Sequence, residues 1–274
     1  MAGGKIVLVP TTETDAFDLD ADAELERITP RTKAILIVTP GNLTAGIVTR
    51  KNIEPIAQIA QEHNLIVISD EIYEKFVYDG WEHVSIGALR GMAERTIKLN
   101  GFSKTYAMTG WRVGSIAAPV DLIPATTRFN QVTNLAAPTL SQWGAYAALT
   151  GPQNLVDEFR AIYAERRALV KDVLDEMGFT YGHPRGAFYV FANTRSTGLN
   201  ATEFAYQLLE RGRVLVLPGA GFGAGMVKLL GHFALAAQRK TDASIGTDAE
   251  CFTELDMSRS RVNSLRPQKG MQHD

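Results

Sequence analysis

Short apolar segments rich in Val and Ile recur along the first part of the chain, each followed by polar residues. Their sequences are KIVLVP at 5–10, AILIV at 34–38, LIVIS at 65–69 and TIKLN at 96–100. Segments of this length and composition are typical of buried strands, and their continuous rather than alternating hydrophobicity indicates that both faces are covered. The pattern therefore predicts an α/β fold, with a mostly parallel sheet and helices on both faces.

A helical period separates the second and third of these strands. Within residues 50–64, Ile53, Ile56 and Ile59 fall on one face of an amphipathic helix. Together with its two flanking strands, this helix predicts a strand–helix–strand unit with a right-handed crossover.

The pattern changes after residue 151. A long amphipathic helix is expected at 154–177, and strands are expected at 186–192 and 214–219. Between those strands, Asn200 and Glu203 form an N-cap signal for another helix. We therefore expect a large α/β domain, a smaller α+β domain and an aberrant, disordered tail at residues 1–150, 151–230 and 231–274.

Composition and charge limit the kinds of molecule that this protein is expected to bind. The 274 residues include 28 basic and 30 acidic ones, so the net charge of −2 does not favour binding to nucleic acid or to an anionic membrane. The single cysteine, Cys251, excludes an intramolecular disulfide, and the five histidines show no metal-ligand spacing. No apolar segment is long enough to span a membrane, and no secretion signal is visible, so we expect a cytoplasmic protein without a metal site.

Polar side chains follow three of the predicted strands, where ligands bind in open α/β sheets. Taken singly, each has an ordinary structural explanation, such as a helix cap for Asp70 or a solvated charge for Lys104. Their joint spacing, D-x-x-Y after one strand and S-K-x7-R after the next, favours a binding site instead. An amide, a carboxylate, a phenol, a hydroxyl, an amine and a guanidinium could together hold a cofactor with a cationic ring nitrogen, an oxyanion and a phosphate. The residues are Asn42, Asp70, Tyr73, Ser103, Lys104 and Arg112.

The segments SDEIYEKF at 69–76 and LNGFSKTYAMTGWRVG at 99–114 resemble the class I/II aminotransferases of fold type I, which depend on pyridoxal 5′-phosphate. The resemblance extends from about residue 3 to about residue 223. It implies a transferase of amino acid metabolism and biosynthesis that moves an amino group between an amino acid and a 2-oxo acid. It also implies a homodimer.

The resemblance also implies a role for each residue of the site. Lys104 would form the Schiff base with the cofactor aldehyde and move the proton, and Asp70 would lie against the pyridine nitrogen. Tyr73 and Asn42 would bond the ring oxygen. Arg112 and Ser103 would bind the phosphate, Arg112 in the bidentate manner that a guanidinium allows.

The chain departs from the family pattern at several places. The segment that precedes GGKIVLVP in the family is missing, so the resemblance implies an N-terminal truncation. The family turn N-P-T-G reads NLTAG at 42–46, and Gly101 stands where many members have a phosphate-binding serine. In the tail, no arginine stands at the position that binds the substrate carboxylate. We interpret the tail as the product of a reading-frame shift, because codons for residues 233–256 can be chosen so that the displaced frame encodes an amphipathic helix.

Three alternatives to an active aminotransferase stay open. The chain could be an inactive, degenerate fragment of one, because part of the cofactor cradle is missing. It could be a cofactor-binding effector domain of a transcription regulator, although no helix-turn-helix segment is visible. It could also be a lyase, because the motifs fix the cofactor better than the bond that is broken.

Overall fold

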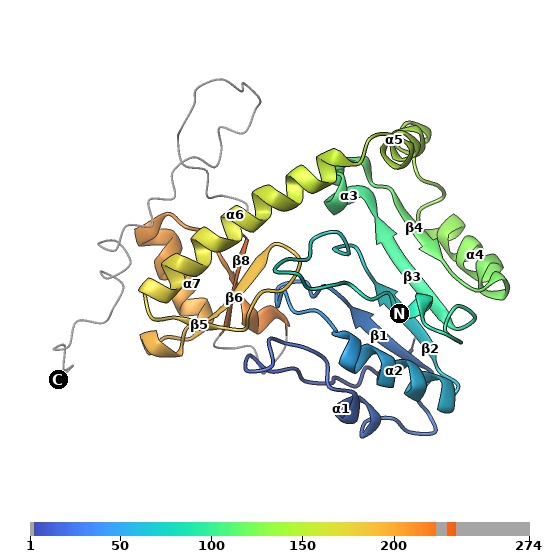
Figure 1. The fold of residues 1–274 in the computed structure, drawn as a ribbon, viewed down its shortest axis with the longest axis horizontal. Coiled ribbons are helices and arrows are strands. Elements are labelled where there is room, and N and C mark those ends of the chain that lie inside the picture. The colour runs from blue at the N-terminus through green and yellow to red at the C-terminus, as the bar shows by residue number, and fades with distance from the viewer. Residues whose placement is uncertain (1–2, 223–228, 234–274) are drawn as a thin grey trace. The chain divides into compact units, whose positions relative to one another are not determined.

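The computed structural model describes residues 3–222 and 229–233, and Figure 1 shows its elements in order. Two compact units are present, one formed by residues 1–161 with 185–187 and the other by residues 162–184 with 188–274. Of the tail expected at 231–274, all but residues 231–233 lies outside the described residues, and so does the segment of the reading-frame hypothesis beyond residue 233. The domain boundaries expected from the sequence stay a prediction.

A four-stranded sheet forms the centre of the first unit. Its order is β1-β2-β3-β4, with β1, β2 and β3 mutually parallel and β4 antiparallel to β3. Three of the predicted strands are present, and β4 is an element that the sequence pattern did not indicate. The α/β fold class is confirmed. The strands are β1 (Ala34–Val38), β2 (Ile66–Asp70), β3 (Thr96–Gly101) and β4 (Gly114–Ala117).

Helix α2 (Arg50–Glu62) covers one face of this sheet, as the sequence predicted. Its buried residues Ile53 and Ile56 belong to the same core cluster as Ile35 and Ile37 of β1. Burial of a side chain of this kind stabilises the fold by roughly 1.5–3 kcal/mol. The short helix α1 (Ala21–Leu25), capped by Asp20, adds to the same side.

Two expectations about the strands are wrong. Residues 5–10 form no strand, and Ile6 and Leu8 are 83% and 73% exposed. A strand needs a neighbour to pair its backbone, and no described strand pairs with this segment. In β1, burial alternates, and Leu36 is 67% exposed because no described helix covers that face of the strand.

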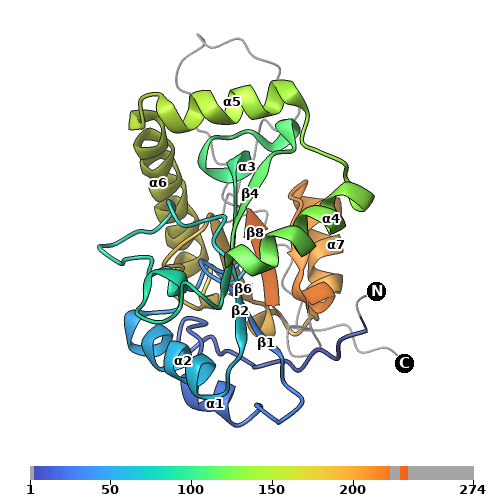
Figure 2. The same cartoon turned by 90° about the vertical axis from the view of Figure 1, so that its right-hand side faces the viewer.

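Three helices follow β3 in the first unit, and they are seen together in Figure 2. Helix α5 lies over the short helix α3, where Ala145 packs with Phe102 and Met108. The α-helices are α3 (Phe102–Thr105), α4 (Ile123–Thr133) and α5 (Thr139–Thr150), and the 3₁₀ turns of this unit are Ile86–Ala88, Thr109–Trp111 and Val120–Leu122.

Helix α6 (Asn154–Glu176) passes from the first unit into the second. The second unit has an antiparallel sheet of order β5-β6-β8-β7, and Val190 of β6 shares a core cluster with Phe204 and Leu208 of α7. The predicted cap of α7 is confirmed as a capping box between Asn200 and Glu203. The remaining elements are β5 (Thr180–Tyr181), β6 (Tyr189–Asn193), α7 (Ala201–Gly212), β7 (Leu217–Pro218), β8 (Leu229–Phe233) and the 3₁₀ turns Arg195–Thr197 and Gly219–Phe222.

Candidate functional site

The carboxyl ends of the three parallel strands meet at one edge of the sheet. Val38 at the end of β1 pairs with Asp70 at the end of β2, and Asp70 pairs with Leu99 near the end of β3. Just beyond β1, the backbone amide of Thr39 donates to the carbonyl oxygen of Asp70 at 3.0 Å. The register therefore places the loops after these strands beside one another.

Three of the predicted site residues come together at this edge. The Tyr73 side chain is buried, and its hydroxyl oxygen accepts a long hydrogen bond from Asn42 Nδ2 at 3.5 Å. The Lys104 Nζ lies 5.9 Å from the centroid of the Tyr73 ring. An amide and a phenol from two loops and an amine from helix α3 thus lie close together.

The loop that carries Asn42 is closed by its own backbone. The amide of Gly41 donates to the carbonyl oxygen of Gly46 at 2.7 Å, and Leu43 and Ala45 adopt left-handed φ angles of 77° and 55°. Proline cannot adopt a positive φ, so this conformation of Leu43 is open only to a sequence without the family's proline. Asn42 keeps its contact with Tyr73 in this altered loop.

Asp70 is held at the end of β2 by its backbone and by one oxygen of its carboxylate. Its Oδ1 accepts a hydrogen bond from the Ile72 amide at 3.2 Å, and the backbone of the next residue, Glu71, donates to Leu99 of β3 at 3.0 Å. Oδ2 accepts no hydrogen bond from any described residue. Asp70 as a whole is only partly buried.

Ser103 and Arg112 are not joined to the other site residues by hydrogen bonds within the described chain. Ser103 lies half-buried on α3. Arg112 is exposed at a left-handed φ of 50°, and its Nη1 donates to the Thr109 carbonyl oxygen at 3.0 Å. The neighbouring Trp111 packs against α5 at Gly144, where a Cβ would approach the indole to 2.5 Å.

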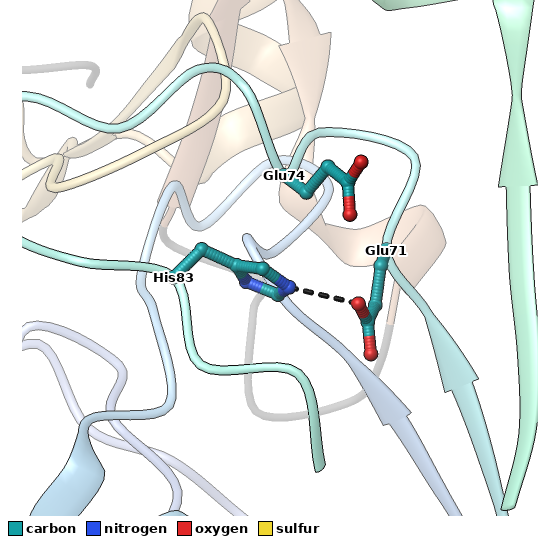
Figure 3. Close-up of side chains that lie close together, drawn as sticks. All are labelled: Glu71, Glu74 and His83. Carbon is teal, nitrogen blue, oxygen red and sulfur yellow. Dashed lines mark hydrogen bonds and ion pairs between the residues drawn. The ribbon is translucent and has the colours of Figure 1, made fainter. Parts of the chain in front are cut away.

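A cluster that the sequence analysis missed lies directly beside this site. Glu71 follows Asp70, and its side chain is fully buried. Figure 3 shows that His83 points at Glu71, with 2.9 Å between Nε2 and Oε2. The same oxygen lies 2.9 Å from Lys98 Nζ, while Oε1 accepts hydrogen bonds from the hydroxyls of Ser69 at 2.8 Å and Ser85 at 2.9 Å.

The charges in this cluster stabilise one another. Burial raises the pKa of Glu71, but hydrogen bonds from His83, Lys98 and Ser69 outweigh it and lower that pKa to about 2. Burial lowers the pKa of Lys98, but hydrogen bonds to Glu74 and Glu71 outweigh it and raise it. Since the Glu71 carboxylate can only accept, the His83 Nε2 must be the donor.

The ligand atoms of Glu71, Glu74 and His83 lie within 4.8 Å of one another, a grouping that could suit a metal ion. The ammonium of Lys98, however, lies 2.9 Å from Glu71 Oε2 and 2.7 Å from Glu74 Oε2. A cation is therefore already supplied by the chain at this cluster, and the grouping does not call for a metal.

The lowered pKa of Glu71 predicts acid-sensitive stability. A carboxyl with a folded-state pKa of about 2 and an ordinary value of 4.5 stabilises the fold above pH 4.5, and this contribution is lost as pH falls from 4.5 to about 2. The difference corresponds to on the order of 3 kcal/mol. Glu71→Gln removes the titration, so its free energy of unfolding should fall less between pH 6 and pH 3 than that of the wild type.

Denaturant unfolding followed by tryptophan fluorescence measures this difference, because all three tryptophans belong to the first unit. Glu82→Gln, at an exposed residue beside His83, is the matched control and should follow the wild type at each pH. Parallel pH curves for Glu71→Gln and the wild type would contradict the prediction.

Little in the sequence pointed to this cluster. Glu71, His83 and Lys98 come from the end of β2, a loop and β3, and no local spacing joins them. The available signal was a second carboxylate directly after Asp70, close behind the apolar segment at 65–69, because a carboxylate buried there would require partners. Of the partners that it has in the fold, Ser69 stands two positions away, whereas His83, Ser85 and Lys98 stand 12 or more positions along the chain.

Comparison with known proteins places this geometry in context. Residues 1–239 match the family described as Aminotransferase class I and II. The chain is 46% identical to the aromatic-amino-acid aminotransferase 2 of Thermococcus litoralis over 226 residues and 45% identical to the aspartate aminotransferase of Pyrococcus abyssi over 225 residues. Each alignment covers 81% of this chain and 58% of the relative.

A solved structure gives the same result. The aromatic aminotransferase from Pyrococcus horikoshii superimposes with a TM-score of 0.82 at 44% identity, covering 85% of this chain and 63% of that protein. The chain thus spans a little over half the length of the curated relatives it matches. Among the helices that the structure describes, none combines the length and apolarity required to cross a bilayer.

Proposed function

This chain belongs to the class I and II aminotransferase family, which depends on pyridoxal 5′-phosphate, and from that premise we propose that it transfers an amino group between an amino acid and a 2-oxo acid. The observation that carries the proposal is the meeting of Asn42, Tyr73 and Lys104 at the carboxyl edge of one parallel sheet.

The donor set suits this cofactor in its chemistry. An amide and a phenol next to one another can bond a ring oxygen, and an amine nearby can meet an aldehyde. Oδ2 of Asp70, which accepts no hydrogen bond from a described residue, can accept one from the N–H of a protonated ring nitrogen. Arg112, exposed and bonded through one of its nitrogens to Thr109, retains donors for a phosphate.

When bound, pyridoxal phosphate supplies an aldehyde that combines with amines and a ring that withdraws electrons. Lys104 Nζ would be the protein's attachment point and would carry the proton between the substrate α-carbon and the cofactor carbon. Tyr73 and Asn42 would orient the ring beside this amine. Asp70 would hold the proton on the ring nitrogen, because a nearby carboxylate favours the cationic form.

Arg112 and Ser103 would bind the phosphate. A guanidinium gives two parallel hydrogen bonds to a phosphate, which a single ammonium cannot. The packing of Trp111 on Gly144 supports this role, because it fixes one side of the turn that bears Arg112.

For the substrate, partners and location we propose the coarser properties of the family. The substrates would be an amino acid and a 2-oxo acid, and the relatives' names include both aromatic and aspartate aminotransferases. A homodimer in the cytoplasm is the expected state. Exposed apolar residues on α5, among them Leu140 and Trp143, support burial of that helix against another surface.

Spectral titration tests the proposal directly. The chain is mixed with pyridoxal phosphate, and we expect a protein-bound absorbance band that borohydride fixes covalently and that an added amino acid shifts. Release of the corresponding 2-oxo acid would establish transfer. A folded chain that binds cofactor without shifting the band would support the effector-domain or inactive-fragment alternative, and one that binds none would refute the proposal.

A further inference from the structure

The buried carboxylate of Glu71 has a place in the fold that its stability role alone does not explain. It lies between Asp70 and Tyr73, the two residues proposed to hold the cofactor ring. Its four partners come from β2, β3 and the loop at 83–85. The side chain therefore fastens one turn to three separate parts of the first unit.

The turn is held to β3 through a second carboxylate as well, because Glu74 Oε2 lies 2.7 Å from Lys98 Nζ. Its backbone is joined to β3 by the Glu71 amide and closed by the Glu74 amide, which donates to the Glu71 carbonyl oxygen at 2.9 Å. The Asp70 side chain bonds within the turn, to Ile72. Glu71 is thus bonded through its side chain to Ser69, which precedes Asp70, and through its backbone amide to Leu99 of β3. These contacts hold the residues on either side of Asp70.

The partners of Glu71 are also matched to a carboxylate. Two hydroxyl donors meet Oε1, and an imidazole and an ammonium meet Oε2. Gln at this position could still bond the hydroxyls through its amide, since a hydroxyl both donates and accepts. It would nevertheless remove the charge that Glu71 presents to Lys98, which would then keep only the ion pair with Glu74 of the two that it makes here. The amide also cannot suit the hydroxyls of Ser69 and Ser85, the imidazole of His83 and the ammonium of Lys98 as well as a carboxylate does.

We propose that Glu71 is a positioning residue, which through Ser69, Ser85, His83 and Lys98 holds Asp70 and Tyr73 in the orientation that the cofactor ring requires. This inference rests on the proposed function. A purely structural residue would affect only the stability of the fold. A positioning residue also affects the affinity for the cofactor, here through Asp70 and Tyr73.

The first part of the test needs no cofactor. Hydrogen exchange of the Ile72 and Glu74 amides reports on the turn, and Glu71→Gln should speed both. Glu82→Gln, the same substitution at an exposed residue beside His83, should leave them at the wild-type rate. Unchanged exchange in Glu71→Gln would overturn the proposal, whatever the cofactor result.

The second part measures pyridoxal phosphate binding by the same proteins at a temperature where melting curves show each to be folded. Glu71→Gln should weaken the affinity about tenfold, as loss of a supporting contact behind a ligand commonly does. It should also alter the pH dependence of the bound cofactor's absorbance, which a change in folding alone would not do. Faster exchange with wild-type affinity and spectrum would make Glu71 a structural residue and overturn the proposal.

Two further outcomes stay interpretable. If Glu71→Gln does not fold, Ser85→Ala removes one hydrogen bond to Glu71 without changing charge. It should still speed exchange and weaken the affinity about threefold, the size of effect expected for the loss of one hydrogen bond. Failure of that variant to do either would overturn the proposal. If the wild type binds no pyridoxal phosphate, the proposed function fails, and the exchange measurement alone decides whether Glu71 holds the turn.

Discussion

Lys104→Ala should remove all borohydride-stable attachment of pyridoxal phosphate to the chain. Lys104 Nζ lies 5.9 Å from the centroid of the Tyr73 ring, at the carboxyl edge of the sheet. Alanine leaves neither an amine to combine with the aldehyde nor a base to move the substrate proton. Turnover should therefore fall by more than about 10⁴-fold, because loss of a general base alone costs about 10²–10⁴-fold and the attachment point is lost as well.

The matched control is Lys51→Ala, at an exposed position on α2. It should keep wild-type labelling, and peptide mapping of the wild type should find the label on Lys104. Label that persists in Lys104→Ala would show that another amine holds the cofactor. Loss of label in both variants would point to an effect of charge or folding instead.

Much of the first unit could be predicted because its signals are local. The apolar segments at β1, β2 and β3 and the helical period of α2 are each contained in a few consecutive residues. The capping box of α7 was equally readable, since Asn200 and Glu203 are three positions apart. These elements form where the sequence placed them.

The misses are elements whose existence depends on a distant partner. Residues 5–10 have the composition of a strand, yet no described strand lies beside them to pair with it. The four residues of β4 carry too little pattern to be noticed, and they form a strand because β3 offers a free edge. Composition gives a segment's preference, and pairing decides whether the strand forms.

The same distinction applies to the site. Asp70, Tyr73 and Lys104 could be selected from short motifs, and the parallel register then explains why their loops are adjacent. Glu71 could not be assigned partners, because His83 and Lys98 reach it only through the fold. Histidine spacing along the chain was a poor guide, since the contact of His83 is made to a carboxylate on another element.

Asp70→Asn separates the charge of this residue from its place in the turn. Asparagine keeps a side-chain oxygen that can accept the hydrogen bond from the Ile72 amide. In the wild type, Asp70 Oδ1 accepts this bond at 3.2 Å. It cannot stabilise a proton on the cofactor's ring nitrogen, because it carries no charge. A unit-charge pair about 4 Å apart contributes roughly 4 kcal/mol near a protein surface, so turnover should fall about 10³-fold.

Folding and attachment should survive this change, since Lys104 and the turn are both intact. We therefore expect a near-normal melting temperature and continued borohydride labelling, with turnover lost. Asp70→Ala is the informative comparison, because it removes the acceptor of the Ile72 amide as well and should add a loss of stability to the same loss of turnover. Wild-type turnover in Asp70→Asn would show that the ring nitrogen needs no carboxylate here, and would leave Asp70 as a residue that shapes the end of β2.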